Sequence, residues 1–415
     1  MIRALYLSHD GMLEPLGQSQ VLPYLRGLAA RGARISLLSF EKPADRRDPE
    51  RERLVQAALD AQGIHWIRLT YHRRPALLAT AWDVAAGLAI AWRLARRNGI
   101  HVVHARSYVA GLMACLLKRA SGVRFVFDMR GFWADERAEA GAWRPDGPVY
   151  RGAKRIERLL LEEADEVITL TEQARRTVAS WLTGRSVRIT VIPTCVNLER
   201  FAPGTGAGAP GRAPVFIYAG SVASWYLPSE LFRFVRQAMG RFPGARLIVL
   251  TRERDAALSA LRESGLPPDR VTIVSADPSA VPGWLAHAHA GLALYRPGFS
   301  RQGTCPTKIG EYLATGLPVV VNAGIGDVDD LIGATGVGVV LPEFSSGAYD
   351  RALDRLEQLW ADPALAARCR QAAASRFSLE SGIERYRAVY LRLCTPAVEA
   401  VDAELPALAL ERSHA

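Results

Sequence analysis

The sequence predicts an α/β protein made of two doubly wound parallel sheets that face a central cleft. Short apolar runs alternate with longer amphipathic runs, which is the pattern of parallel strands connected by helices. A Gly-, Ala- and Pro-rich stretch at residues 202–214 divides two such series and reads as a linker. The length of 415 residues also suits two domains, since domains run roughly 100 to 200 residues each.

The first series, residues 1–201, predicts an N-terminal Rossmann-like domain. Its expected strands are residues 3–8, 34–40, 101–105, 125–128, 166–170 and 188–192. Helices are expected at residues 19–31, 49–62, 77–98, 108–121 and 150–163.

The second series, residues 215–375, predicts a C-terminal domain of the same kind. Its expected strands are residues 215–219, 245–251, 271–275, 291–295, 319–322 and 338–341. Helices are expected at residues 228–239, 255–264, 281–288 and 307–315, and the chain reads as helical from 349 to about 393. Helices at 376–395 either cross back to the N-terminal domain or pack on their own domain, and residues 396–415 look like a loose tail.

Composition narrows the class of partner. A net charge of +10 favours anionic partners, but no helix-turn-helix, zinc-finger or aromatic RNA-binding signature accompanies it, so nucleic acid is not expected. The five cysteines form no CxxC pair, which fits a reducing cytoplasm and predicts neither disulfides nor zinc. The first eleven residues read as a strand rather than a signal peptide. The apolar stretch 75–92 is interrupted by Asp83, so no transmembrane helix is expected.

The segment GTCPTKIGEYLATGLPVVVNAGIGD, residues 303–327, carries the strongest chemical signal. Pro306 and Thr307 begin a helix that carries Lys308 and Glu311. The dipole and unpaired N–H groups of a helix N-terminus suit a diphosphate, Lys308 adds a positive charge, and Glu311 is placed to accept ribose hydroxyls. The alternative is an ordinary helix and strand whose Lys and Glu are solvated.

Within residues 303–327, the run PTKIGEYLATGLPVV resembles the donor-binding segment of GT-B fold glycosyltransferases, in particular the large retaining family 4. The resemblance extends to about residue 393 and implies a GT-B fold, a nucleotide-diphosphate sugar donor and retention of anomeric configuration. In that family two glutamates eight positions apart commonly hold the donor. Only the second has a counterpart here, Glu311, while Gly303 takes the position of the first.

The resemblance also implies a phosphate clamp just after the first strand of the second domain. The matching stretch is YAGSVASWYLP, residues 218–228, where Ser221 follows Gly220 in the position of the family's Arg and no Lys follows. We therefore expect other cations to bind the diphosphate, and Arg296, Arg301 and Lys308 are the nearest candidates.

The opening SHDGMLEPLGQSQVLPYLRGLAARGARISLLSF is similar to the start of the same family. In it, Gly17 would allow the backbone to approach the donor phosphate or the acceptor, because glycine has no side chain to obstruct contact. A plain turn is the alternative.

Candidate catalytic residues lie where two strands of the first domain end. Asp128 and Arg130 occupy one strand end, where many family members carry a histidine in place of Asp128. The carboxylate is placed to bind a sugar hydroxyl, and to assist deprotonation if its pKa is raised. The alternative is a structural Asp128–Arg130 pair. His104, at the end of another strand, is a lesser candidate, since a single histidine is more often structural.

The loop after Arg130 predicts an acceptor pocket shaped by Trp133, Asp135 and Glu136. A solvated charged loop explains these residues nearly as well. Asp327, Asp329 and Asp330 form no DxD at a strand end, so we expect them to bind sugar hydroxyls or cap a helix, and we expect neither a metal nor a cofactor.

The apolar helix around Trp82 and Trp92 is flanked by arginines, which is typical of helices that bind anionic lipid interfaces, although its apolar residues suit a core as well. Taken together, the sequence predicts a cytoplasmic, metal-independent hexosyl- or related glycosyltransferase, which could associate with the inner face of the membrane. Its acceptor would be a glycan or a lipid-linked molecule, as in cell-surface polysaccharide synthesis. The alternatives are a nucleotide-sugar 2-epimerase of the same architecture and a non-catalytic sugar-nucleotide-binding protein.

Overall fold

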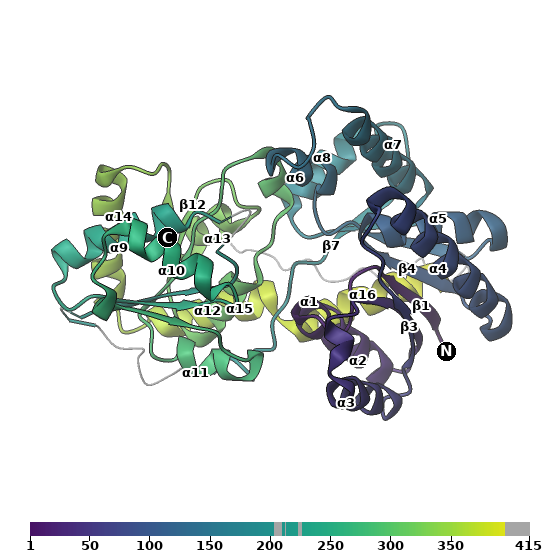
Figure 1. Ribbon diagram of the computed structural model, residues 1–415, viewed down its shortest axis with the longest axis horizontal. Coiled ribbons are helices and arrows are strands. Elements are labelled where there is room, and N and C mark those ends of the chain that lie inside the picture. Colours follow the sequence, from purple (N-terminus) through teal and green to yellow (C-terminus); the bar gives the residue numbers. More distant parts are fainter. Residues whose placement is uncertain (203–209, 212, 223–225, 395–415) are drawn as a thin grey trace, which may run out of the picture.

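The computed structural model describes residues 1–202, 210–211, 213–222 and 226–394 (Figure 1). The predicted tail, residues 396–415, and most of the predicted linker lie outside the described residues. The predicted fold class is confirmed: two parallel sheets, each covered by helices, carry the two halves of the chain.

The N-terminal half contains a seven-stranded parallel sheet in the order β3-β2-β1-β4-β5-β6-β7. Its strands are β1 (Arg3–Ser8), β2 (Arg34–Glu41), β3 (His65–Thr70), β4 (Val102–Arg106), β5 (Arg124–Asp128), β6 (Glu166–Thr169) and β7 (Arg188–Val191). Its helices are α1 (Pro15–Gln20), α2 (Leu22–Ala30), α3 (Pro49–Asp60), α4 (Ala76–Asn98), α5 (Ser107–Ser121), α6 (Trp133–Glu139), α7 (Pro148–Glu163) and α8 (Glu172–Trp181). The chain reverses its direction of winding between β1 and β4, so these two strands define the switch point where α/β sheets bind ligands.

The sequence missed β3 and treated α1 and α2 as one helix. β3 is an edge strand that pairs only with β2 in the described chain, and His65 and Arg68 interrupt its apolar pattern. An edge strand needs less apolar sequence than a central one, because part of it stays in contact with water. The single helix expected at residues 19–31 is broken at Val21, and α6 and α8 were not expected.

The C-terminal half contains a six-stranded parallel sheet in the order β10-β9-β8-β11-β12-β13. Its strands are β8 (Val215–Ala219), β9 (Arg246–Leu250), β10 (Val271–Val274), β11 (Ala290–Ala293), β12 (Val319–Asn322) and β13 (Gly338–Leu341). Its helices are α9 (Pro228–Arg241), α10 (Arg254–Ser264), α11 (Val281–Leu285), α12 (Thr307–Thr315), α13 (Val328–Thr335), α14 (Ser346–Trp360) and α15 (Leu365–Phe377). The switch point here lies between β8 and β11.

The last described helix, α16 (Leu379–Cys394), leaves the C-terminal half and packs on α2 and β4 of the N-terminal half (Figure 1). Ile383, Tyr386, Val389 and Tyr390 are buried in the same apolar cluster as residues of β1 and α2. Contact is close because glycines lie on both sides: a Cβ at Gly27 would stand 2.2 Å from the Ile383 side chain. The helix therefore ties the two halves together.

The sequence left open whether the apolar residues of helix α4 belong to a core or stay exposed. The helix is 23 residues long and, among the described residues, is the one helix whose length and composition would allow it to cross a membrane. Only 22% of its most apolar window is buried in the protein. The inward side consists of Ala79, Asp83, Gly87 and Ala91, which recur every four residues and pack on the domain.

Candidate functional site

Helix α12 places Lys308 beside the β8–β11 switch point of the C-terminal sheet. The Lys308 side chain is buried, with 6% of its surface exposed. Its Nζ lies 4.0 Å from the ring centre of Tyr218 and 4.0 Å from that of Tyr226, which are cation–π distances. Gly220 makes room for it, because a Cβ there would stand 2.8 Å from Nζ. Within the described residues this Nζ has no hydrogen-bond partner.

Burial disfavours the charge of both ionisable groups on α12. It lowers the pKa of Lys308 well below its ordinary value, which the nearby Glu311 only partly offsets. Burial also raises the pKa of Glu311 to about 7, against the opposing effect of Arg200 and Lys308. An anion bound next to Lys308 would supply the missing counter-charge, and ligand hydroxyls would supply donors to Glu311.

The N-terminus of α12 faces the other half of the molecule. No side chain caps it at Pro306. Gln20, at the end of α1, donates to Thr307 Oγ1 over 2.8 Å. The Oε1 atom of Gln20 accepts hydrogen bonds from Arg106 over 3.1 Å and from Arg130 over 3.0 Å. The amide of Gln20 thus contacts the α12 N-terminus, the buried Arg106 at the end of β4 and the partly buried Arg130 after β5.

Asp128, at the end of β5, belongs to a buried network. Its Oδ2 accepts from the Tyr386 hydroxyl over 2.9 Å and lies 3.5 Å from His104 Nε2 and 3.7 Å from Arg130 Nη1. Burial alone would raise its pKa, but Arg130 and His104 outweigh that effect and hold the pKa at about 2. The raised pKa on which the deprotonation role depended is therefore absent, and these contacts favour the alternative of a structural Asp128–Arg130 pair.

His104 and Arg130 are held by the same network. His104 is 1% exposed, its Nδ1 lies 2.8 Å from the Tyr390 hydroxyl, and burial lowers its pKa. His104 is therefore enclosed by the protein in this structure. Arg130 has a φ of 63°, a left-handed value that non-glycine residues seldom adopt and that costs roughly 1 to 3 kcal/mol. The surrounding contacts hold this backbone and aim the guanidinium at Asp128 and Gln20.

Gly17 was expected to let a donor phosphate or an acceptor approach the backbone, but in the structure it packs against its own chain. A Cβ on Gly17 would stand 2.3 Å from the carbonyl oxygen of Gly11 and 2.7 Å from Cα of Met12. The glycine therefore allows α1 to pack on the loop after β1, and the space next to it is filled by this chain rather than open to a ligand.

The structure separates the three expected acceptor-side residues. Asp135 accepts hydrogen bonds from Tyr150 over 2.8 Å and Lys154 over 2.9 Å, so it joins α6 to α7 and does not face the cleft. Trp133 packs on Tyr108, with ring centres 5.5 Å apart. Glu136 alone faces the C-terminal half: burial raises its pKa, and the charge of Arg301 partly opposes this.

The loop before α12, a 3₁₀ turn at Phe299–Gly303, is pressed against the N-terminal half. A Cβ on Gly303 would stand 3.1 Å from the Phe132 ring and 3.3 Å from Cα of Gly131, so a side chain at this position would press on both residues in the present arrangement. Arg301 is buried and bonds to Ser300, and its charge acts on Tyr226 as well as Glu136.

The other two expected donor residues lie at strand ends of the C-terminal sheet. Arg296 follows β11 and is exposed. The hydroxyl of Ser221 lies 2.9 Å and 2.8 Å from the two carboxylate oxygens of Glu253, which holds the loop after β8.

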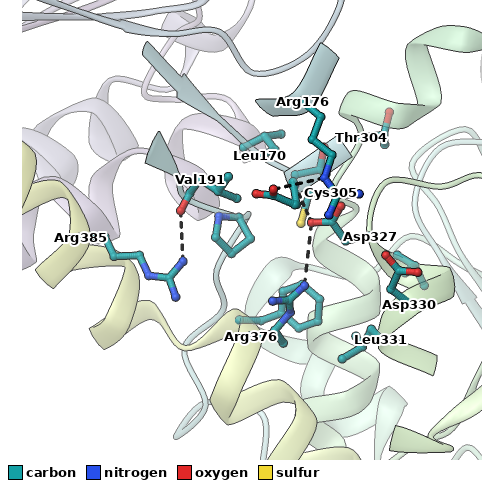
Figure 2. A pocket seen from close by; sticks show the side chains of 15 residues that line it. Leu170, Arg176, Val191, Thr304, Cys305, Asp327, Asp330, Leu331, Arg376 and Arg385 are labelled. Atoms are coloured by element: carbon teal, nitrogen blue, oxygen red, sulfur yellow. Dashed lines mark hydrogen bonds and ion pairs between the residues drawn. The ribbon is translucent and has the colours of Figure 1, made fainter. Parts of the chain in front are cut away.

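A second set of contacts joins the halves on the β6 side. The carboxylate of Asp327 accepts from the backbone N–H groups of Glu172 and Gln173, over 2.7 and 3.1 Å, and so caps α8 of the opposite half. Next to this contact lies a cavity of about 560 Å³ lined by both halves, where Arg376 and Arg385 point inward (Figure 2). Lys308 and Glu311 do not line this cavity.

Sequence reasoning missed Gln20 and the tyrosines around Lys308. Gln20 lies three residues after Gly17, in the segment quoted for the N-terminal resemblance, but a single amide carries no chemical signature. Tyr218 and Tyr226 lie in residues 218–228, the stretch that lacks the family's Arg and Lys. The ring centre of Tyr295, after β11, lies 5.7 Å from Lys308 Nζ. Their aromatic faces could only be recognised as a set once the fold brought them together.

Comparisons with known proteins agree with this architecture. Residues 17–195 match the family model of the glycosyl transferase 4-like domain. A D-inositol 3-phosphate glycosyltransferase of Mycobacterium tuberculosis is 26% identical over 335 residues, covering 74% of this chain and 65% of its own length. The match thus spans just under two thirds of that relative.

Solved structures share the whole fold at low identity. A sucrose-phosphate synthase from Thermosynechococcus elongatus superposes with a TM-score of 0.70 at 19% identity, covering 95% of this chain and 99% of its own. Anabaena HepE, solved with UDP and glucose, gives 0.67 at 15% identity, covering 94% and 99%. These likenesses establish the two-sheet fold.

Proposed function

We propose that this chain, a family 4-like protein of GT-B fold, is a glycosyltransferase that takes a sugar from a nucleotide-diphosphate donor held mainly by its C-terminal half. The acceptor would be a glycan or a lipid-linked molecule, as in the assembly of cell-surface polysaccharide. The names of the similar proteins support the donor class, since HepE was solved with UDP and glucose.

One observation carries the proposal: the buried Lys308 ammonium lies at the β8–β11 switch point without a hydrogen-bond partner among the described residues. A buried cation of this kind is costly unless an anion accompanies it for part of its working cycle. The site also offers the uncapped N-terminus of α12 and the Glu311 carboxyl, which suit a phosphate and a ribose hydroxyl.

These residues would act mainly on the leaving group. As the bond between the sugar and the diphosphate breaks, negative charge grows on the diphosphate, and Lys308 and the α12 N–H groups would stabilise it. Lys308 would replace the cations that the family carries after β8, because its ammonium rests on Tyr226 in that same loop. Arg301 is a second candidate cation for the diphosphate.

The enclosed Gly303 bears on how the sugar is held. Since no acid stands at 303, Glu136 of α6, which faces the same loop, is a candidate carboxylate for sugar hydroxyls. Asp128 would then help to position Arg130 and Gln20 at the α12 N-terminus rather than exchange protons.

Thermal stabilisation by a panel of UDP- and GDP-sugars tests donor binding, because a ligand that binds only the folded state raises its stability. At a free concentration one hundred times the Kd, the gain is about 2.7 kcal/mol. No stabilisation by any member of the panel, with calorimetry in agreement, would favour a non-catalytic role, for which the enclosed Gly303 is the relevant observation.

An activity assay separates transfer from epimerisation. Release of free nucleotide that depends on an added acceptor supports transfer, whereas interconversion of the donor without acceptor supports a 2-epimerase. Metal independence is part of the proposal, and unchanged turnover after chelation with EDTA is the expected result.

A further inference from the structure

The outward side of α4 is apolar along most of its length. Leu77, Leu78 and Trp82 are 76%, 71% and 66% exposed, and Trp92 is 41% exposed. The exposed positions between them are all alanines: Ala81, Ala85 and Ala89. A helix on the surface of a soluble domain normally turns charged and polar residues outward. Among the described residues nothing covers this apolar side, although its composition is typical of a contact surface.

Arginines surround this apolar side at both ends. Arg73 and Arg74 precede the helix, Arg93, Arg96 and Arg97 occupy its last turns, and all five are exposed. Arg96 lies over the Trp92 ring, 4.4 Å from its centre. The whole chain carries a net charge of +10. Apolar and aromatic residues bounded by arginines match the chemistry of an anionic lipid interface, where acyl chains meet phosphate head groups.

The inward side packs on the domain, which argues against α4 as a helix that crosses a bilayer. A Cβ on Gly87 would stand 2.5 Å from Met113 Sδ, so α4 packs closely on the domain. Asp83 is 1% exposed, and its carboxylate binds His72 Nδ1 over 2.6 Å and lies 3.4 Å from His9 Nε2. Lipid cannot surround a helix that is held in this way along one side.

We propose that the outward side of α4 docks this protein on an anionic phospholipid bilayer, with Leu77, Leu78 and Trp82 entering the acyl region of one leaflet. The first turn of α4 follows β3 at the carboxyl edge of the N-terminal sheet, the edge where β1 and β4 end. His9 and His72, at the β1 and β3 ends, are joined to α4 through Asp83. Docking thus brings the bilayer next to the acceptor side of the cleft, which, if the proposed transferase function holds, favours a lipid-linked acceptor.

Vesicle co-sedimentation tests the surface. The probes are phosphatidylcholine vesicles with and without phosphatidylglycerol, at low and high salt. We expect binding to the anionic vesicles and, for a triple variant Leu77→Ser, Leu78→Ser and Trp82→Ser, roughly a hundredfold weaker partitioning. Replacing Arg93, Arg96 and Arg97 by Gln should weaken it by about fivefold per arginine, and less at high salt. The matched controls are Leu54→Ser, since Leu54 is 66% exposed on α3, and Arg252→Gln in the C-terminal half.

The proposal is overturned if the full chain does not bind anionic vesicles at low salt, or if the triple variant binds them as tightly as the Leu54→Ser control does. A second copy of the chain is the other possible occupant: loss of a dimer in the triple variant, with vesicle binding unchanged, would assign the surface to self-association. Stabilisation by nucleotide sugars is measured on the same variants. It should be unaffected, so failure of the docking surface and failure of the donor site give different results.

Discussion

Asp128, at the end of β5, and Lys308, on α12 beside the ends of β8 and β11, are both buried ionisable side chains, but their surroundings affect their charges in opposite ways. Asp128 is surrounded by Arg130, His104 and Tyr386, and its pKa is held at about 2. Lys308 rests on tyrosine faces and its pKa is lowered, toward the neutral form. The first environment stabilises a charge without help, and the second leaves a charge that a ligand would stabilise.

This difference separates a structural network from a binding site. Both clusters contain groups of the kind that catalysis uses, and both lie near the cleft. In the cluster on α12 the Lys308 Nζ has no hydrogen-bond partner among the described residues, so an anionic ligand would improve its energy. The following predictions test that distinction, beginning with the largest effect.

Removing the charge of Asp128, which lies beside Arg130, should strongly lower the stability of the protein. Asp128→Asn leaves Arg130 buried without its counter-charge, so we expect the free energy of unfolding to fall by about 3 to 5 kcal/mol. Denaturant unfolding measures it. Tyr386→Phe, which removes only the hydrogen bond to Asp128, should cost about 1 kcal/mol. An equal, small effect of both variants would show that the Asp128 charge is not anchored by this network.

Removing the Lys308 amine should leave stability intact but weaken donor binding. Lys308→Met keeps most of the length of the side chain and removes an amine with no hydrogen-bond partner in the described structure, so stability should stay unchanged or rise. Donor affinity in calorimetry should fall about 10- to 100-fold, because a charge-assisted contact is lost. Lys118→Met, on α5, serves as a control and should leave donor affinity unchanged. Normal donor binding by Lys308→Met would remove the basis of the proposed site.

The pH dependence of stability should differ between the two clusters. Glu311 has a folded-state pKa of about 7, above its ordinary 4.5, so the folded state holds the proton more tightly and stability falls as pH rises through this range. Relative to the wild type, Glu311→Gln should gain about 2 kcal/mol on going from about pH 5 to about pH 8. Asp128, with a lowered pKa, contributes stability that is lost as pH falls from about 4 toward 2. A Glu311→Gln difference that does not vary with pH would contradict the burial of this carboxyl.

The space beside Lys308 offers a finer test. Gly220→Ala places a Cβ 2.8 Å from Nζ, which should displace the ammonium and weaken donor binding roughly tenfold. Gly122→Ala, at a position of φ 71° with nothing within 4 Å, carries only the backbone cost of about 1 kcal/mol and should bind donor normally. If the two variants bind donor equally, the position of Nζ does not matter for binding.

The smallest expected effect concerns the bridge between the halves. Gln20→Ala removes the contact to Thr307 and the acceptor for two arginines, so turnover should fall a few-fold with little change in donor affinity. Gln56→Ala, on α3 and distant in the fold, is the control for steady-state kinetics. A change in donor affinity that equals the change in turnover would place Gln20 in donor binding instead.

Many strands could be predicted from the sequence because strands at the centre of a parallel sheet are apolar on both faces. The runs that became β1, β5 and β12 needed no context to be recognised. β3 escaped because an edge strand tolerates residues such as His65 and Arg68. The helix that carries Lys308 and Glu311 was also predictable, since Pro306 and Gly316 mark its two ends.

What each polar residue does was decided by tertiary structure. From the chain alone, Asp128 could be an acid, a base or a structural partner. Its lowered pKa depends on Arg130 and His104, and its Oδ2 also accepts a hydrogen bond from Tyr386, which is more than 250 residues away in the chain. Gly17 and Gly303 are glycines because other backbone and ring atoms approach them, which local sequence does not encode. Local pattern determines where strands and helices form, whereas the energy of a buried charge depends on every group that the fold brings within a few ångströms of it.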